Sequence, residues 1–267
     1  MSEESTGVSS TMLLALGVIG GLLGIYLVPI NPYVGPLLGC LGAVCAIIWG
    51  ADAIRRVAGY GLGTGVPSIG YMSLGIGIIG ALSGIGIVTI SALKGLAIAG
   101  PIFSLIFAMI IGLIVAVIAK KIVGMKIPVL ERCTAEIAGA AALSVLGFSA
   151  AIAGNFTIEP ILSSVISSGF IALFFIMNTM AIQHPFNACL GPNEDQVRTL
   201  KCAVSTAFLA MVITGILALS AGGISWLIII VVGLIGWIVS FRSFMKASYE
   251  AAASVKWAGL WPKLDDQ

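Results

Sequence analysis

The sequence predicts an all-α, polytopic integral membrane protein, on the basis of its composition, its hydropathy and the spacing of its charges. Of its 267 residues, 59% are hydrophobic and 9% are charged, and the mean hydropathy is +1.15. A soluble domain carries about 25% charged residues, so this chain has too few to cover a water-facing surface. The composition therefore excludes a soluble enzyme.

The intervals without charged residues define the membrane spans. They are residues 5–51, 57–93, 95–119, 137–158, 160–193 and 202–241. The first and last are long enough for two crossings of about 20 residues each, with turn residues at 29–32 and 220–223. The predicted helices are 11–29, 34–51, 67–93, 96–119, 136–154, 159–182, 202–220 and 224–241. Eight helices are expected, with seven as the alternative if the first does not span.

The distribution of Lys and Arg predicts the orientation. With eight spans, every one of the 13 Lys and Arg residues except Lys94 falls on the side of the N-terminus. Because positive residues accumulate on the cytoplasmic side, both termini are expected in the cytoplasm. Residues 1–10 then form a cytoplasmic N-terminus, 11–241 the membrane domain and 242–267 a cytoplasmic tail.

A glycine pattern recurs in the odd-numbered predicted helices. Each fits G-x-x-[GA]-x-x-x-G, beginning at Gly17, Gly77, Gly147 and Gly215. Small residues four apart let helix backbones approach closely in lipid. The pattern suggests repeated helical hairpins, although a chain this rich in Gly and Ala also matches by chance. The predicted helix-packing positions are Gly20, Gly24, Gly80, Gly84 and Gly154.

Ionisable residues inside a membrane are expensive to bury and often functional. Here Asp52, Glu136 and Glu159 all fall at predicted helix ends, so no acid is expected near the middle of the membrane. Glu136 is the one candidate for a role near a cytoplasmic cavity through which a cation enters, and a solvated helix end is the alternative. A single histidine excludes a bis-histidine haem. We expect no catalytic residue, bound cofactor or metal in this chain.

Three segments suggest a family: the stretch Gly-Tyr-Gly-Leu-Gly-Thr-Gly-Val-Pro at 59–67, the polar loop from His184 to Lys201, and the tail from Arg242 to Lys263. With these segments the whole chain resembles the C subunit of the membrane-bound tetrahydromethanopterin S-methyltransferase of methanogenic archaea. The resemblance implies a multisubunit complex in the cell membrane that transfers a methyl group from methyl-tetrahydromethanopterin to coenzyme M, coupled to sodium extrusion.

The resemblance also implies the partners of this chain. They would be D-like and E-like membrane subunits and another subunit that carries the corrinoid. The chain itself would act as a scaffold and as part of the ion-translocation unit, and Glu136 would then lie near a sodium path. The net charge of +2 is too small to suggest nucleic-acid binding.

Two other interpretations compete with this one. A stand-alone secondary transporter would purify alone and bind its substrate between broken helices near the midplane. A membrane-embedded enzyme acting on lipid would need converging acids or histidines, which the sequence does not place together.

Overall fold

A computed structural model describes residues 7–60, 65–188 and 195–253, and every regular element in this part of the chain is a helix. The long helices are α1 (Ser10–Leu27), α2 (Gly35–Ala58), α3 (Gly65–Ile87), α4 (Gly100–Lys121), α5 (Leu130–Ala153), α7 (Phe170–Ala188), α8 (Gln196–Ser220) and α9 (Trp226–Ala253). The shorter elements are η1 (Val28–Ile30), η2 (Ser91–Ala99), α6 (Ile158–Ile161) and the π-helical turn η3 (Leu162–Ile166). Residues 1–6, 61–64, 189–194 and 254–267, which include parts of the expected N-terminus, polar loop and tail, lie outside the described residues.

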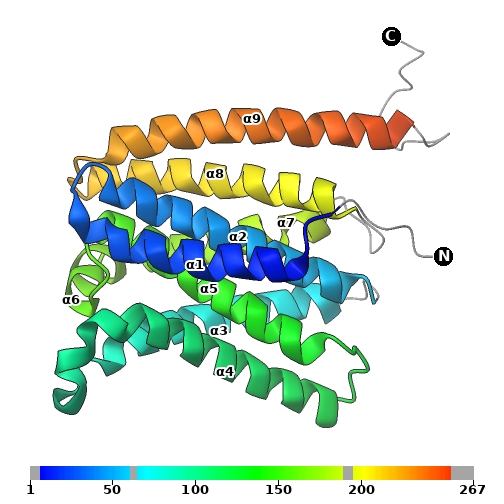
Figure 1. The fold of residues 1–267 in the computed structure, drawn as a ribbon, viewed down its shortest axis with the longest axis horizontal. Helices are drawn as coiled ribbons and strands as arrows, with labels where there is room; N and C mark the ends of the chain where they lie inside the picture. The colour runs from blue at the N-terminus through cyan, green and yellow to red at the C-terminus, as the bar shows by residue number, and fades with distance from the viewer. Residues whose placement is uncertain (1–6, 61–64, 189–194, 254–267) are drawn as a thin grey trace.

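The all-α, membrane-spanning fold class is confirmed. Seven of the described helices are long and apolar enough to cross a membrane, and a bent pair of helices would make an eighth crossing. The helices lie roughly side by side (Figure 1), with α9 on α8, α8 on α2, and α2 on α5. On the other side of α5, α3 and α4 complete the bundle.

Helix α5 forms the centre of the bundle. All of the 18-residue apolar stretch by which it could span the membrane is buried, whereas 11% of the corresponding stretch of α9, at the edge, is buried. Alanine and glycine dominate its sequence between Ala138 and Ala151, and small side chains let several neighbours approach one helix at once. For this reason α5 can contact α1, α2, α3, α4, α7 and α8.

The helix expected at 159–182 is broken. The structure instead has α6 and η3, then a bend of 88°, then α7. Four serines precede Gly169, and three of them donate to the carbonyl four residues earlier, as Ser168 does to Ser164 at 2.8 Å. Such back-bonding bends helices, and Gly169 at φ +78° ends the segment.

The bent segment nevertheless returns the chain across the bundle. Helix α5 ends at one end of the molecule and α8 begins at the other (Figure 1), and α7 lies between them in sequence. The ambiguity between seven and eight spans therefore lies in α6 and α7. The sequence places this ambiguity in the first helix. In the structure the first helix qualifies as a span.

Several helix boundaries also differ from those expected. Helix α5 begins at Leu130 and not at 136, α8 begins at Gln196 and not at 202, and α9 continues to Ala253, beyond 241. The predicted spans end at charged residues, but ion pairs allow charges within the terminal turns. Lys246 and Glu250, for example, are paired at 3.8 Å on α9.

Four of the five glycines singled out from the pattern lie in close helix contacts. A Cβ on Gly20 would meet Cys45 at 3.0 Å, one on Gly24 would meet the Leu38 carbonyl at 2.6 Å, and one on Gly80 would meet Ala108 at 2.5 Å. On Gly84 a Cβ would meet the backbone nitrogen of Ser104 at 2.1 Å.

Gly154 was expected at a helix–helix or subunit interface, and it makes no close helix contact within the described chain. A Cβ there would meet nothing within 4 Å, but the residue has φ +65° and caps the end of α5. Gly222, at the equivalent place in the fourth repeat, also has a positive φ, +78°. The last glycine of the pattern therefore packs helices in the first two repeats and ends a helix in the last two.

Candidate functional site

The strongest concentration of buried charge lies where the end of α2 meets the start of α5. We call it the charged cluster, and it comprises Asp52, Arg55, Arg56, Arg132 and Glu136. The two carboxylates are buried, with Asp52 at 0% and Glu136 at 2% exposure. Three guanidinium groups surround them, so the cluster carries an excess of one positive charge.

Glu136 accepts hydrogen bonds from two helices. Its Oε1 accepts from Arg132 Nε at 2.7 Å and from Arg56 Nη1 at 3.4 Å. Its Oε2 accepts from Trp49 Nε1 at 3.0 Å and from Arg56 Nη2. A carboxylate has about four lone-pair positions, and four donors occupy those of Glu136. The arrangement therefore leaves this carboxylate without a free position for a further ligand.

Asp52 connects the cluster to α8. Its Oδ2 accepts from Arg56 Nε at 3.2 Å, and its Oδ1 accepts from Arg55 Nη2 at 3.2 Å and from Gln196 Nε2 at 2.9 Å. Gln196 also donates to the Val8 carbonyl at 2.9 Å, ahead of α1. Arg56 bridges the two carboxylates, so the cluster and Gln196 together join α2, α5, α8 and the segment ahead of α1 at one end of the bundle.

The structure corrects the expected environments of two acids. Asp52 and Glu136 were expected at helix ends within reach of the membrane surface, with Glu136 facing a cavity or solvent. Because α5 starts at Leu130, Glu136 lies in its second turn and is buried. Glu159 differs from them, since it is exposed in α6 as expected.

The sequence interpretation missed Trp49, Arg56 and Gln196 as members of this network. Part of it was visible, since Arg56 and Glu136 each follow an oppositely charged residue, Asp52 and Arg132, by four positions. The bonds from Arg56 and Trp49 to Glu136 join residues at least 80 positions apart, and no local spacing reveals them.

Polar side chains deeper in the bundle bond to their own or neighbouring helices. Asn178 of α7 accepts from Ser144 of α5 and donates to the Phe174 carbonyl at 2.8 Å. Thr179 donates to the Phe175 carbonyl at 2.9 Å. Of these bonds, only the one from Ser144 to Asn178 joins two helices, and the other two lie within α7.

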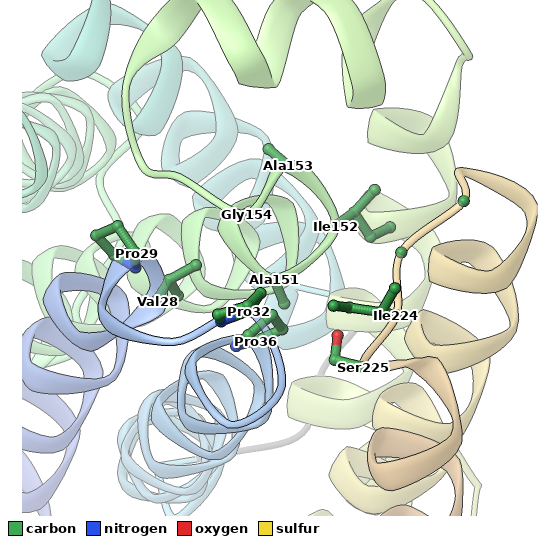
Figure 2. A pocket seen from close by; sticks show the side chains of 12 residues that line it. Val28, Pro29, Pro32, Pro36, Ala151, Ile152, Ala153, Gly154, Ile224 and Ser225 are labelled. Atoms are coloured by element: carbon green, nitrogen blue, oxygen red, sulfur yellow. The ribbon is translucent and has the colours of Figure 1, made fainter.

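A pocket of about 300 Å³ lies at the opposite end of the bundle. Figure 2 shows it between the connection from α1 to α2, with Pro32 and Pro36, and the end of α5 at Gly154. Ile224 and Ser225, just before α9, close its third side. None of the described residues that line it is ionisable.

Comparison with known proteins assigns the family. The family of the C subunit of tetrahydromethanopterin S-methyltransferase matches residues 1–265. The chain belongs to this family. The C subunit of the tetrahydromethanopterin S-methyltransferase of Methanothermobacter thermautotrophicus is 62% identical over 97% of this chain and 96% of its own length.

More distant members of this family match over similar lengths. The protein of the same description from Methanosarcina mazei is 48% identical over 95% of this chain and 92% of its own. The protein of the same description from Methanococcus maripaludis is 40% identical over 94% of this chain and 93% of its own length. The family resemblance inferred from the sequence is therefore confirmed along nearly the whole chain.

Proposed function

We propose that this chain is the membrane-integral C subunit of a multisubunit complex that transfers a methyl group from methyl-tetrahydromethanopterin to coenzyme M and couples the transfer to sodium extrusion. The observation that carries the proposal is the 62% identity, over 97% of this chain, with a protein described as the C subunit of tetrahydromethanopterin S-methyltransferase. The coupling to sodium comes from the family resemblance alone.

The charged cluster supports a scaffold role within such a complex. Arg56 and Arg132 neutralise Glu136, and donors fill its lone-pair positions, so it is poorly suited to bind a passing sodium ion. We therefore assign the essential sodium ligands to partner subunits, D-like and E-like, and the corrinoid to a further subunit. This chain would contribute the wall and the packing of the ion-translocation unit and would bind no cofactor itself.

The location proposed is the cell membrane, with both termini in the cytoplasm. The start of α1 and the end of α9 lie at the same end of the bundle (Figure 1), as do the ends of α2 and α4 with their basic residues. A concentration of Arg and Lys at one end supports a cytoplasmic location for that end.

The test is purification of the native assembly through an affinity tag on this chain, after gentle detergent extraction. The proposal expects several different subunits to co-purify, together with methyl transfer from methyl-tetrahydromethanopterin to coenzyme M. A matched untagged extract is the control. Recovery of this chain alone, or only with copies of itself, would contradict the proposal and favour the stand-alone transporter.

A further inference from the structure

A groove runs along the outer face of the α8–α9 pair and is not part of the charged cluster. Its volume is about 600 Å³. Helix α8 contributes residues spaced by one helical turn, and α9 contributes a matching stripe. The lining residues on α8 are Gln196, Val197, Leu200, Lys201, Val204 and Phe208, and those on α9 are Ile235, Gly236, Val239, Ser240 and Ser243.

Phe208 packs directly against a glycine of α9 in the lining of the groove. Gly236 has no side chain, and a Cβ there would meet the ring of Phe208 at 2.4 Å. At the other end, Val8 completes the lining, where its carbonyl accepts from Gln196 Nε2 at 2.9 Å. In the described chain α9 packs almost entirely on α8 and lies at the edge of the bundle, and no further element lies beyond it. In a membrane, the groove would therefore open towards lipid.

The polarity of the groove changes along its length. Its deep part is lined by Val204, Phe208, Ile235 and Val239, which are apolar. Its polar side chains lie nearer the end that carries the charged cluster, and within the described chain Lys201 is the only charged residue that lines it. Lys201 is five residues into α8, about 8 Å along the helix, within reach of the head-group region by extending its side chain.

We propose that this groove binds one membrane lipid with an anionic phosphate head group. Its hydrocarbon chain would lie along Val204, Phe208 and Ile235, and its phosphate would pair with the Lys201 ammonium. Ser243 lines the same polar end and would donate its hydroxyl to a phosphate oxygen. Basic pockets between membrane helices on the cytoplasmic side are suited to acidic lipid head groups.

Charge complementarity favours an acidic lipid over a neutral one. Among the described residues that line the groove there is one cation and no acid. Two acids lie beside Gln196 at its polar end: Asp195 lines a neighbouring polar pocket with Arg55, and Asp52 is paired with Arg55 and with Arg56. A single lysine near the membrane surface contributes about 1 kcal/mol to binding an anionic lipid, a factor of about five. The apolar part of the groove adds affinity that does not depend on the head group.

The test is native mass spectrometry of the full-length chain in detergent, titrated with phosphatidylglycerol or with phosphatidylcholine of the same acyl chains. We expect one phosphatidylglycerol per chain at concentrations where phosphatidylcholine binds about fivefold more weakly. Lys201→Gln should remove this preference. Val204→Trp should fill the groove and weaken both lipids, and Leu200→Trp provides a second such variant should the first fail to fold.

Matched controls separate the groove from the general lipid surface. Lys246→Gln removes the same charge from an exposed position on α9, and Val231→Trp adds the same bulk to an exposed position of that helix. Neither residue lines the groove, so both variants should bind as wild type.

Three results would overturn the proposal. They are equal binding of the two lipids by the wild-type chain, an unchanged preference in Lys201→Gln, and displacement of phosphatidylglycerol by glycerol phosphate, which would indicate an anion site without a lipid requirement. In the purified complex, a photo-crosslink from position 204 to another subunit would also overturn it, because a polypeptide would then fill the groove.

Discussion

At the scale of single residues, the carboxylate of Glu136 and the guanidinium of Arg56 depend on each other. Both lie in the buried end of the bundle, where Glu136 is 2% exposed and the side chain of Arg56 is 16% exposed. Removing one partner from a buried ion pair leaves the other charge uncompensated in a medium of low dielectric constant. An exposed pair makes a much smaller contribution, because water and side-chain entropy offset it.

Glu136→Gln should therefore lower the free energy of unfolding by about 3 kcal/mol. The measurement is the thermal midpoint of the detergent-solubilised protein, followed by tryptophan fluorescence. Glu131→Gln is the matched control on the same helix, because Glu131 pairs with Lys120 at 3.1 Å while 34% exposed. That change should cost less than about 1 kcal/mol. Equal changes in the thermal midpoint for the two substitutions would show that burial of the charged cluster contributes nothing to the free energy of unfolding.

At the scale of helices, α3 and α4 approach through glycine. Gly80 faces Ala108, and Gly84 faces Ser104, four residues later on α3 and four earlier on α4. In lipid, such contacts replace the hydrophobic effect as the source of helix association, because lipid tails are as apolar as the helices.

Gly84→Ala should separate α3 from α4, since its Cβ would lie 2.1 Å from the backbone nitrogen of Ser104. Overpacking of this kind costs about 1–3 kcal/mol, and we expect a lower thermal midpoint. Gly75→Ala, on the same helix with nothing within 4 Å of its Cβ, should raise stability by up to about 1 kcal/mol through helix propensity. The same sign for both substitutions would contradict this packing.

The bend before α7 makes a second prediction at this scale. Topology reporters fused to this chain show on which side of the membrane each fusion point lies. If α7 crosses the membrane, reporters fused after Glu159 and after Lys201 must lie on opposite sides. Reporters fused after Lys126 and after Glu159 should also lie on opposite sides. Reporters after Arg56, Lys126 and Lys201 should read cytoplasmic, and those after Lys94, Glu159 and Gly222 external. Finding Glu159 and Lys201 on the same side would show that α6 and α7 form a re-entrant loop.

Which of these features the sequence could predict depends on whether a local pattern determines them. Charge-free intervals predict most membrane spans, because charge is excluded from lipid over a fixed length of helix. The bend at the serines before Gly169 was missed because those residues are also tolerated in straight membrane helices. The bond from Trp49 to Glu136 was missed because it depends on how α2 packs against α5.

At the scale of the whole molecule, burial falls from the centre to the edge. Helix α5 is buried along the whole 18-residue apolar stretch by which it could span the membrane. In α1 and α4 33% of the corresponding stretch is buried, and in α9 11%. The outer helices therefore present apolar faces to lipid or to other membrane subunits. An organisation with its charges paired inside and its apolar faces outside is consistent with the scaffold role proposed above.

The most direct test of this account is the number of sodium ions moved per methyl group transferred. It would be measured as uptake of radioactive sodium into liposomes that contain the purified complex with Glu136→Gln in this chain. The account predicts less assembled complex but an unchanged ratio of sodium to methyl in the complex that does assemble. Methyl transfer without sodium uptake would contradict it, because Glu136 would then act on the transported ion itself.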